Sequence, residues 1–192
     1  MKNLKTFTLK SEYENYQECF FEVAKYAYGD SLGIFINSYV EGPICDLSTN
    51  ITGDYGSLWT SDMLPKNAFF IKGYDGMPTI AKDLESKGLI KSLEIETYQG
   101  FGKYNAYQIE PKALRFMEPN DVKNELIKYF KKDENFIEKT KDVEKSKIDD
   151  YFAGKLEENE AEILDEITKT ELTTKAEFED EYVENDICDN CE

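Results

Sequence analysis

The sequence predicts an α+β fold, in which an antiparallel sheet carries one main helix and a helical, acidic C-terminal extension follows. Three observations support this prediction. The aromatic and β-branched residues that favour strands are concentrated in the first 110 residues. After Pro111 the apolar residues recur at helical spacing instead. Most of the net charge of −17 lies at the end of the chain, where a compact core is least expected.

Three strands are predicted at the front, joined by short turns as in an antiparallel meander. Glu18–Tyr28 is rich in apolar and aromatic residues and ends at a Gly-Asp turn. Ser31–Val40 alternates apolar residues onto one face, and Pro43–Ile51 alternates again.

A fourth strand, a helix and a final pair of strands complete the predicted sheet domain. The fourth strand is Asn67–Lys72, and the helix begins at Pro78 and ends near Gly88. Ile90–Tyr98 and Lys103–Ile109 form the last pair. One helix lying on such strands is the usual arrangement of a small α+β domain.

The chain is predicted to divide into three parts. Residues 1–117 form the compact domain, and 118–170 form a charged helical region that starts at Pro119–Asp121 and is interrupted near Gly154. Residues 171–192 form an acidic tail with too few apolar residues to build a core, so we expect it to be disordered when free.

The acidic end of the chain is the strongest indication of function. Residues 149–192 hold seventeen carboxylates against three lysines, a net charge of −14. Such a block attracts cations, which favours a basic protein partner over direct binding of nucleic acid. A helix rises 1.5 Å per residue, and B-form DNA carries one negative charge per about 1.7 Å of its axis. Carboxylates at every second or third position of a helix therefore give an electrostatic field comparable to that of DNA, though sparser. The candidate partner-binding residues are Glu157, Glu158, Glu160, Glu162, Asp165, Glu166, Glu177, Glu179, Asp180, Glu181 and Glu184. The alternative is a solvated tail that only keeps the protein soluble.

A second candidate surface is the turn that carries Tyr98, Phe101 and Tyr104. Large exposed aromatic residues often dominate protein–protein interfaces. The alternative is that these rings pack the turn onto the core. If they do bind a protein, the chain is an interaction module, and its C-terminal helices could form a homodimer.

Catalysis is not expected. The chain has no histidine, which excludes Ser/His and Cys/His nucleophile pairs and every histidine-containing metal site. A carboxylate site for Mg²⁺ would have to come from the front-domain aspartates, which show no recognisable metal spacing: Asp46, Asp54, Asp62, Asp75 and Asp83. We therefore predict no catalytic residue, no metal and no cofactor.

The four cysteines fall into two pairs. Cys19 and Cys45 lie in predicted strands and are expected to be small buried hydrophobes. Cys188 and Cys191 have the spacing of half a zinc site or of a redox pair, but neighbouring carboxylates should raise their thiol pKa, and an incidental surface pair is a third alternative. The chain shows neither a secretory leader nor the roughly 20 apolar residues of a membrane span, so we expect a cytoplasmic protein.

An ordered series of short segments carries a resemblance to a known family. The segments are Ala24–Asp30, Leu32–Ile36, Asp46–Asn50, Lys66–Ile71, Pro78, Leu84–Leu89 and Gly100–Ile109. Over residues 19–110 the chain resembles a small family of uncharacterised domains carried on plasmids, phages and conjugative elements. The resemblance implies a mobile-element setting, in which small acidic proteins often inhibit host defence nucleases. The family has no assigned catalytic residues, and the extension after Met117 has no counterpart in it.

Together these observations predict a non-enzymatic inhibitor of the anti-CRISPR or anti-restriction type. It would act as an acidic nucleic-acid mimic that blocks the basic groove of a CRISPR effector or a restriction enzyme. The alternative is a protein–protein interaction or regulatory module of a mobile element, with an acidic tail that aids solubility.

Overall fold

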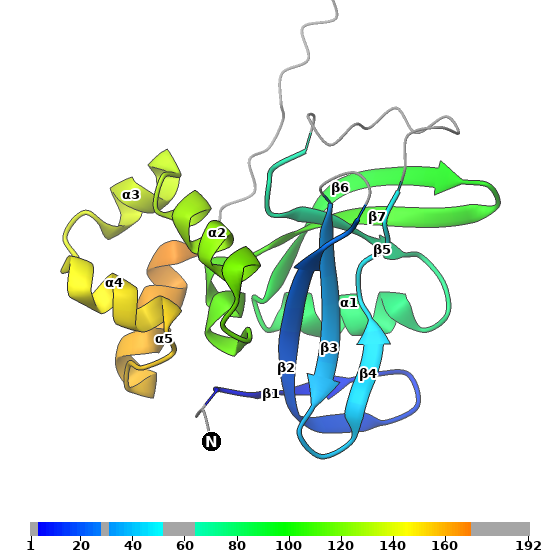
Figure 1. The fold of residues 1–192 in the computed structure, drawn as a ribbon, viewed down its shortest axis with the longest axis horizontal. Helices are drawn as coiled ribbons and strands as arrows, with labels where there is room; N and C mark the ends of the chain where they lie inside the picture. The colour runs from blue at the N-terminus through cyan, green and yellow to red at the C-terminus, as the bar shows by residue number, and fades with distance from the viewer. Residues whose placement is uncertain (1–3, 28–30, 52–63, 170–192) are drawn as a thin grey trace, which may run out of the picture.

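The first sheet forms an antiparallel meander at the front of the molecule. The structure, a computed structural model, describes residues 4–27, 31–51 and 64–169 of the 192-residue chain. The sheet contains, in spatial order, β1 (Phe7–Lys10), β2 (Asn15–Lys25), β3 (Leu32–Ser38) and β4 (Gly42–Asp46) (Figure 1). The last three match the predicted meander, and β1 was not predicted.

The second sheet has three antiparallel strands in the order β5-β7-β6. These are β5 (Ala68–Lys72), β6 (Ile90–Gln99) and β7 (Gly102–Ile109). Helix α1 (Met77–Ser86) packs against β1, β5 and β6, so it contacts both sheets. The α+β fold predicted from the sequence is therefore confirmed, with the strands divided between two sheets.

The two sheets separate because β4 ends earlier than its alternating pattern predicts. The backbone N–H groups of Leu47 and Ser48 both donate to the Ile34 carbonyl, at 2.9 and 3.2 Å. The Ser48 hydroxyl oxygen accepts from the Ile34 N–H at 2.8 Å, in place of a strand partner. The chain then crosses to the second sheet, where the Thr49 N–H donates to the Phe70 carbonyl at 2.8 Å.

The C-terminal region of the described chain is a cluster of short helices that lies beside the sheets (Figure 1). A 3₁₀ helix, η3, connects the two parts, and the helices follow in chain order: η3 (Pro111–Phe116), α2 (Asp121–Phe130), α3 (Glu134–Thr140), α4 (Lys145–Phe152) and α5 (Glu158–Thr168). Buried Phe130, Phe152 and Leu164 belong to the same hydrophobic cluster as Phe21 and Ile34 of the first sheet. One core therefore runs across the boundary predicted at residue 117.

Local side-chain hydrogen bonds fix where these helices begin. The Asn120 side chain accepts from the Lys123 N–H at 2.8 Å and donates to the Val23 carbonyl at 2.7 Å, so the cap also ties α2 to β2. Asp133 accepts from the Phe136 N–H at 2.9 Å and starts α3, a short helix within the predicted helical region 118–170. Gly154 has φ of +70°, which separates α4 from α5 as predicted.

Candidate functional site

A cluster of charged side chains joins α5 to the sheet domain, and Arg115 lies at its centre. Arg115 is the only arginine of the chain and is 1% exposed. Its guanidinium donates to Asp165 Oδ2 at 2.8 Å and to Glu158 Oε1 at 3.1 Å. The rings of Phe116 and Tyr151 lie 5.6 and 5.7 Å from it. A planar guanidinium suits this position because it can serve two carboxylates and stack on rings at once.

Asp165 and Glu158 therefore both form ion pairs with the sheet domain and η3. The Asp165 side chain is 8% exposed, accepts from the Tyr151 hydroxyl at 2.7 Å and lies 3.2 Å from Lys112 Nζ. Glu158 is 61% exposed and lies 2.8 Å from Lys5 Nζ. Hydrogen bonds from Lys5 and Arg115 lower the pKa of Glu158, and burial raises the pKa of the Tyr151 phenol. Of the acidic residues predicted to bind a partner, these two are paired with Arg115.

The outward face of α5 carries the other predicted carboxylates. Glu157, Glu162 and Glu166 are exposed and form no ion pair with any residue in the described ranges. Glu160 is exposed and pairs with Lys147 at 3.0 Å. The buried side of the helix consists of Ala161, Leu164 and Thr168, so the carboxylates point to solvent. The predicted residues Glu177, Glu179, Asp180, Glu181 and Glu184 lie outside the described residues.

The aromatic turn between β6 and β7 is divided between solvent and core. Phe101 at its tip is wholly exposed and Tyr98 is exposed. Tyr104 is 8% exposed and packs edge-on against Tyr74, with ring centroids 6.2 Å apart. A Cβ on Gly102 would lie 2.8–3.0 Å from the hydroxyl and ring of Tyr104, so glycine lets that ring fold under the turn. Of the three predicted contact residues, the structure exposes Phe101 and Tyr98.

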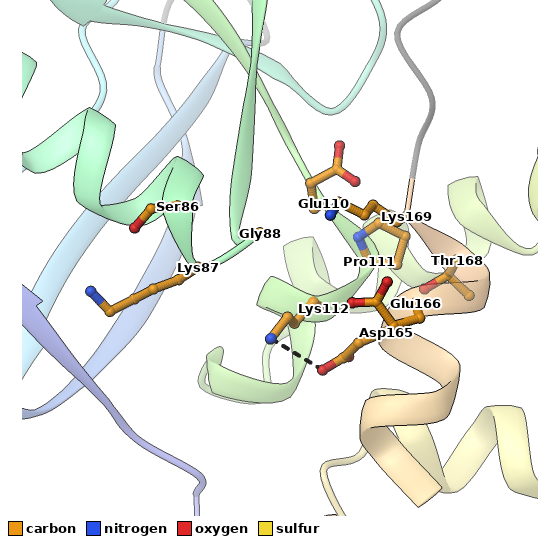
Figure 2. A pocket seen from close by; sticks show the side chains of 10 residues that line it. All are labelled: Ser86, Lys87, Gly88, Glu110, Pro111, Lys112, Asp165, Glu166, Thr168 and Lys169. Carbon is orange, nitrogen blue, oxygen red and sulfur yellow. Dashed lines mark ion pairs between the residues drawn. The ribbon is translucent and has the colours of Figure 1, made fainter. Parts of the chain in front are cut away.

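A pocket of about 150 Å³ lies where the end of α1, the start of η3 and the end of α5 meet (Figure 2). Its charged lining residues are Lys87, Lys112, Lys169, Glu110, Asp165 and Glu166. Lys112 pairs with Asp165 across it (Figure 2), and Lys87 pairs with Asp83 of α1. Three cations and three anions leave no net charge to select an ionic ligand. The volume is that of about five waters, which suits a hydrated polar cleft.

The described thiols are inert. Cys19 in β2 is fully buried and Cys45 in β4 is partly buried, close to what the sequence predicted. Burial raises the pKa of Cys19 to about 11 and of Cys45 to about 12, so neither is a reactive thiolate at neutral pH. Cys188 and Cys191 lie outside the described residues.

Nowhere in residues 4–27, 31–51 and 64–169 do three cysteine or carboxylate side chains gather as a metal site would require. None of the helices in this part of the chain combines the length and apolar character needed to cross a bilayer.

Comparisons with protein families, with curated proteins and with solved structures find no match to this chain. The resemblance to a mobile-element family therefore rests on the sequence segments alone.

Proposed function

We propose that the protein inhibits a nucleic-acid-binding enzyme of host defence, of the anti-CRISPR or anti-restriction type, by placing carboxylates in its basic groove. The observation that carries this proposal is that Glu162 and Glu166 on α5, and Glu157 at its N-cap, are exposed and have no ion-pair partner among the described residues. The family resemblance adds the mobile-element setting. Enzymes of this kind act in the cytoplasm, the compartment expected from the sequence.

The spacing of these carboxylates is adequate for such contacts. Glu162 and Glu166 are one helical turn apart, which is about 6 Å along the axis. Phosphates follow one another every 3.4 Å along one strand of B-form DNA, so the helix offers roughly half that linear density. The remaining charge would come from residues 170–192, which hold nine carboxylates and one lysine.

The test measures DNA cleavage by a panel of restriction endonucleases and RNA-guided nucleases as the full-length protein is titrated in. A variant with Glu157, Glu162 and Glu166 changed to Gln should inhibit about tenfold less strongly, if each carboxylate contributes about 0.5 kcal/mol. The matched control changes three exposed glutamates of the sheet domain that lack ion pairs in the described structure, Glu12, Glu18 and Glu94, to Gln.

The control removes the same charge and should inhibit like the native protein. Equal inhibition by both variants, or no inhibition of any nuclease in the panel, would contradict the proposal. A truncated variant that ends at Lys169 shows whether inhibition needs the tail or only α5. Truncation before residue 149 is unsuitable, because it would remove buried Tyr151, Phe152 and Leu164 from the core.

A second candidate function is a protein–protein interaction module, and the exposure of Phe101 favours it. The ring lies at the tip of a hairpin, between two glycines, and no residue of the described ranges buries it. Burying a phenylalanine is worth about 2 kcal/mol, a gain available to a binding partner. Sedimentation equilibrium of the native protein and of Phe101→Ser tests self-association. A dimer that persists above about 0.3 M salt and is lost in the variant supports this candidate, and a monomer in all cases opposes self-association through Phe101.

A further inference from the structure

Three lysines lie around Glu125 on one side of α2, and a fourth follows Lys128 by about one helical turn, in a molecule whose net charge is −17. They are Lys25 at the end of β2, Lys66 just before β5, and Lys128 and Lys132 on and after α2; we call these four residues the lysine patch. Lys25 Nζ lies 2.6 Å from Glu125 Oε2. The hydrogen bond from Lys25 lowers the pKa of Glu125, and the charges of Lys128 and Lys66 lower it further.

Lysines outnumber carboxylates on this face of α2. Lys128 lies about one helical turn beyond Glu125, and Lys132 about one turn beyond Lys128. On the same face, Asp121 precedes Glu125 by one turn. Four ammonium groups lie near these two carboxylates, with Asp133 next to Lys132, so this face attracts an acidic ligand.

The described chain ends close to this patch. Its last residue, Lys169, lines the same pocket as Glu110 (Figure 2). The neighbouring Ile109 is bonded to Asn67 twice: its N–H donates to the Asn67 carbonyl at 3.0 Å, and the Asn67 side chain donates to its carbonyl at 2.8 Å. Asn67 follows Lys66 directly. An extended residue spans about 3.3 Å, so the 23 residues after Lys169 reach the patch with ample length.

We infer that the acidic segment 170–192 binds the lysine patch of its own chain. The segment carries a net charge of −8, so its charge complements the patch. Exposed ion pairs are individually weak and screened by salt, but a short tether raises the effective concentration to roughly the millimolar range. The contact is therefore reversible. The regulatory consequence rests on the function proposed above. The basic groove of a target enzyme then competes with the patch for the segment, so the patch weakens inhibition until a target draws the segment away.

Zero-length carbodiimide cross-linking of the full-length protein tests the contact, because it joins a lysine to a carboxylate only when they touch. Mass spectrometry should find Lys66 and Lys128 joined to carboxylates between Glu177 and Glu184, with the yield falling several-fold above about 0.3 M salt. A variant with Lys66, Lys128 and Lys132 changed to Gln should lose these cross-links between the patch and the segment. The matched control, with exposed Lys10, Lys82 and Lys145 changed to Gln, should retain them.

Two kinds of result would overturn the inference. One is a failure in the cross-linking itself: either no cross-links form between the patch and the segment in the native protein, or the patch variant gives an unchanged yield of segment cross-links through other lysines. The other is cross-linking only between light and heavy copies in a mixture of unlabelled and ¹⁵N-labelled protein, which would place the segment on a second molecule.

Nuclease assays separate this inference from the proposed function. If both hold, the patch variant inhibits about fivefold more strongly than the native protein, because the internal competitor is gone, and the lysine control does not change. If cross-links form but no nuclease is inhibited, the proposed function fails and the contact stands. If inhibition occurs without cross-links, the contact fails and the function stands.

Discussion

Replacing Asp165 with Asn tests whether the charged cluster around Arg115 stabilises the packing of α5 on η3. The change keeps the shape of the side chain and removes its charge. It leaves a guanidinium that is 1% exposed with one carboxylate partner, Glu158, which is mostly in solvent. Removing one partner from a buried ion pair costs about 3–5 kcal/mol. Asn can still accept from the Tyr151 hydroxyl, so we expect the lower end, about 3 kcal/mol.

Thermal and urea unfolding measure this loss. For a chain of this size about 3 kcal/mol corresponds to a fall in Tm of roughly 6–12 °C. The matched control is Glu162→Gln on the exposed face of the same helix, which should change stability by no more than about 0.5 kcal/mol. If Asp165→Asn is as stable as this control, the cluster does not hold the helix and the reasoning is refuted. A double-mutant cycle with Arg115→Met then isolates the pair, and we expect a coupling of about 1 kcal/mol or more.

Three further predictions concern stability. Burial lowers the pKa of Lys123 from 10.5 to about 8, so between these pH values the native state binds fewer protons than the unfolded state. The stability of the native protein relative to Lys123→Met, measured by urea unfolding, should therefore rise by up to about 3 kcal/mol as the pH increases through this window. The same pH dependence of stability in both proteins would contradict this. Gly154→Ala should lower stability by about 1–2 kcal/mol in thermal unfolding, because φ is +70° and the new Cβ would lie 3.2 Å from the Arg115 carbonyl oxygen; an unchanged Tm would show that the turn relaxes freely. Phe101→Ser should change the free energy of unfolding by no more than about 0.5 kcal/mol, whereas Phe152→Ala should lower it by about 3–5 kcal/mol. A large loss of stability in Phe101→Ser would mean that Phe101 is packed.

Strand and helix periodicity predicted most of the sheet domain. The alternating runs that correspond to β2, β3, β6 and β7 are long and bounded by glycine turns, so their pattern was unambiguous. The end of β4 could not be predicted, because it depends on the Ser48 hydroxyl replacing a strand partner of Ile34, a contact between residues fourteen apart. β1 has only four residues, too few for a period to stand out.

The C-terminal region shows where charge counting is insufficient. Asp165 and Glu162 belong to the same run of carboxylates on α5. Asp165 is bound by Arg115, whereas Glu162 faces solvent, and only their positions around the helix relative to the core explain this difference. Helical spacing does indicate that residues 161, 164 and 168 share the buried side. It does not reveal that a buried arginine fifty residues earlier selects Asp165, since that requires the packing of η3 on α5.

Burial of the single arginine has a practical consequence. An arginine-specific protease, or a dicarbonyl reagent such as phenylglyoxal, has one target in this chain, and the folded protein shields it. Because α5 and η3 enclose that target, the rate of cleavage or adduct formation reports how often these elements part. The native sequence thus contains its own probe of local opening, with no engineered label required.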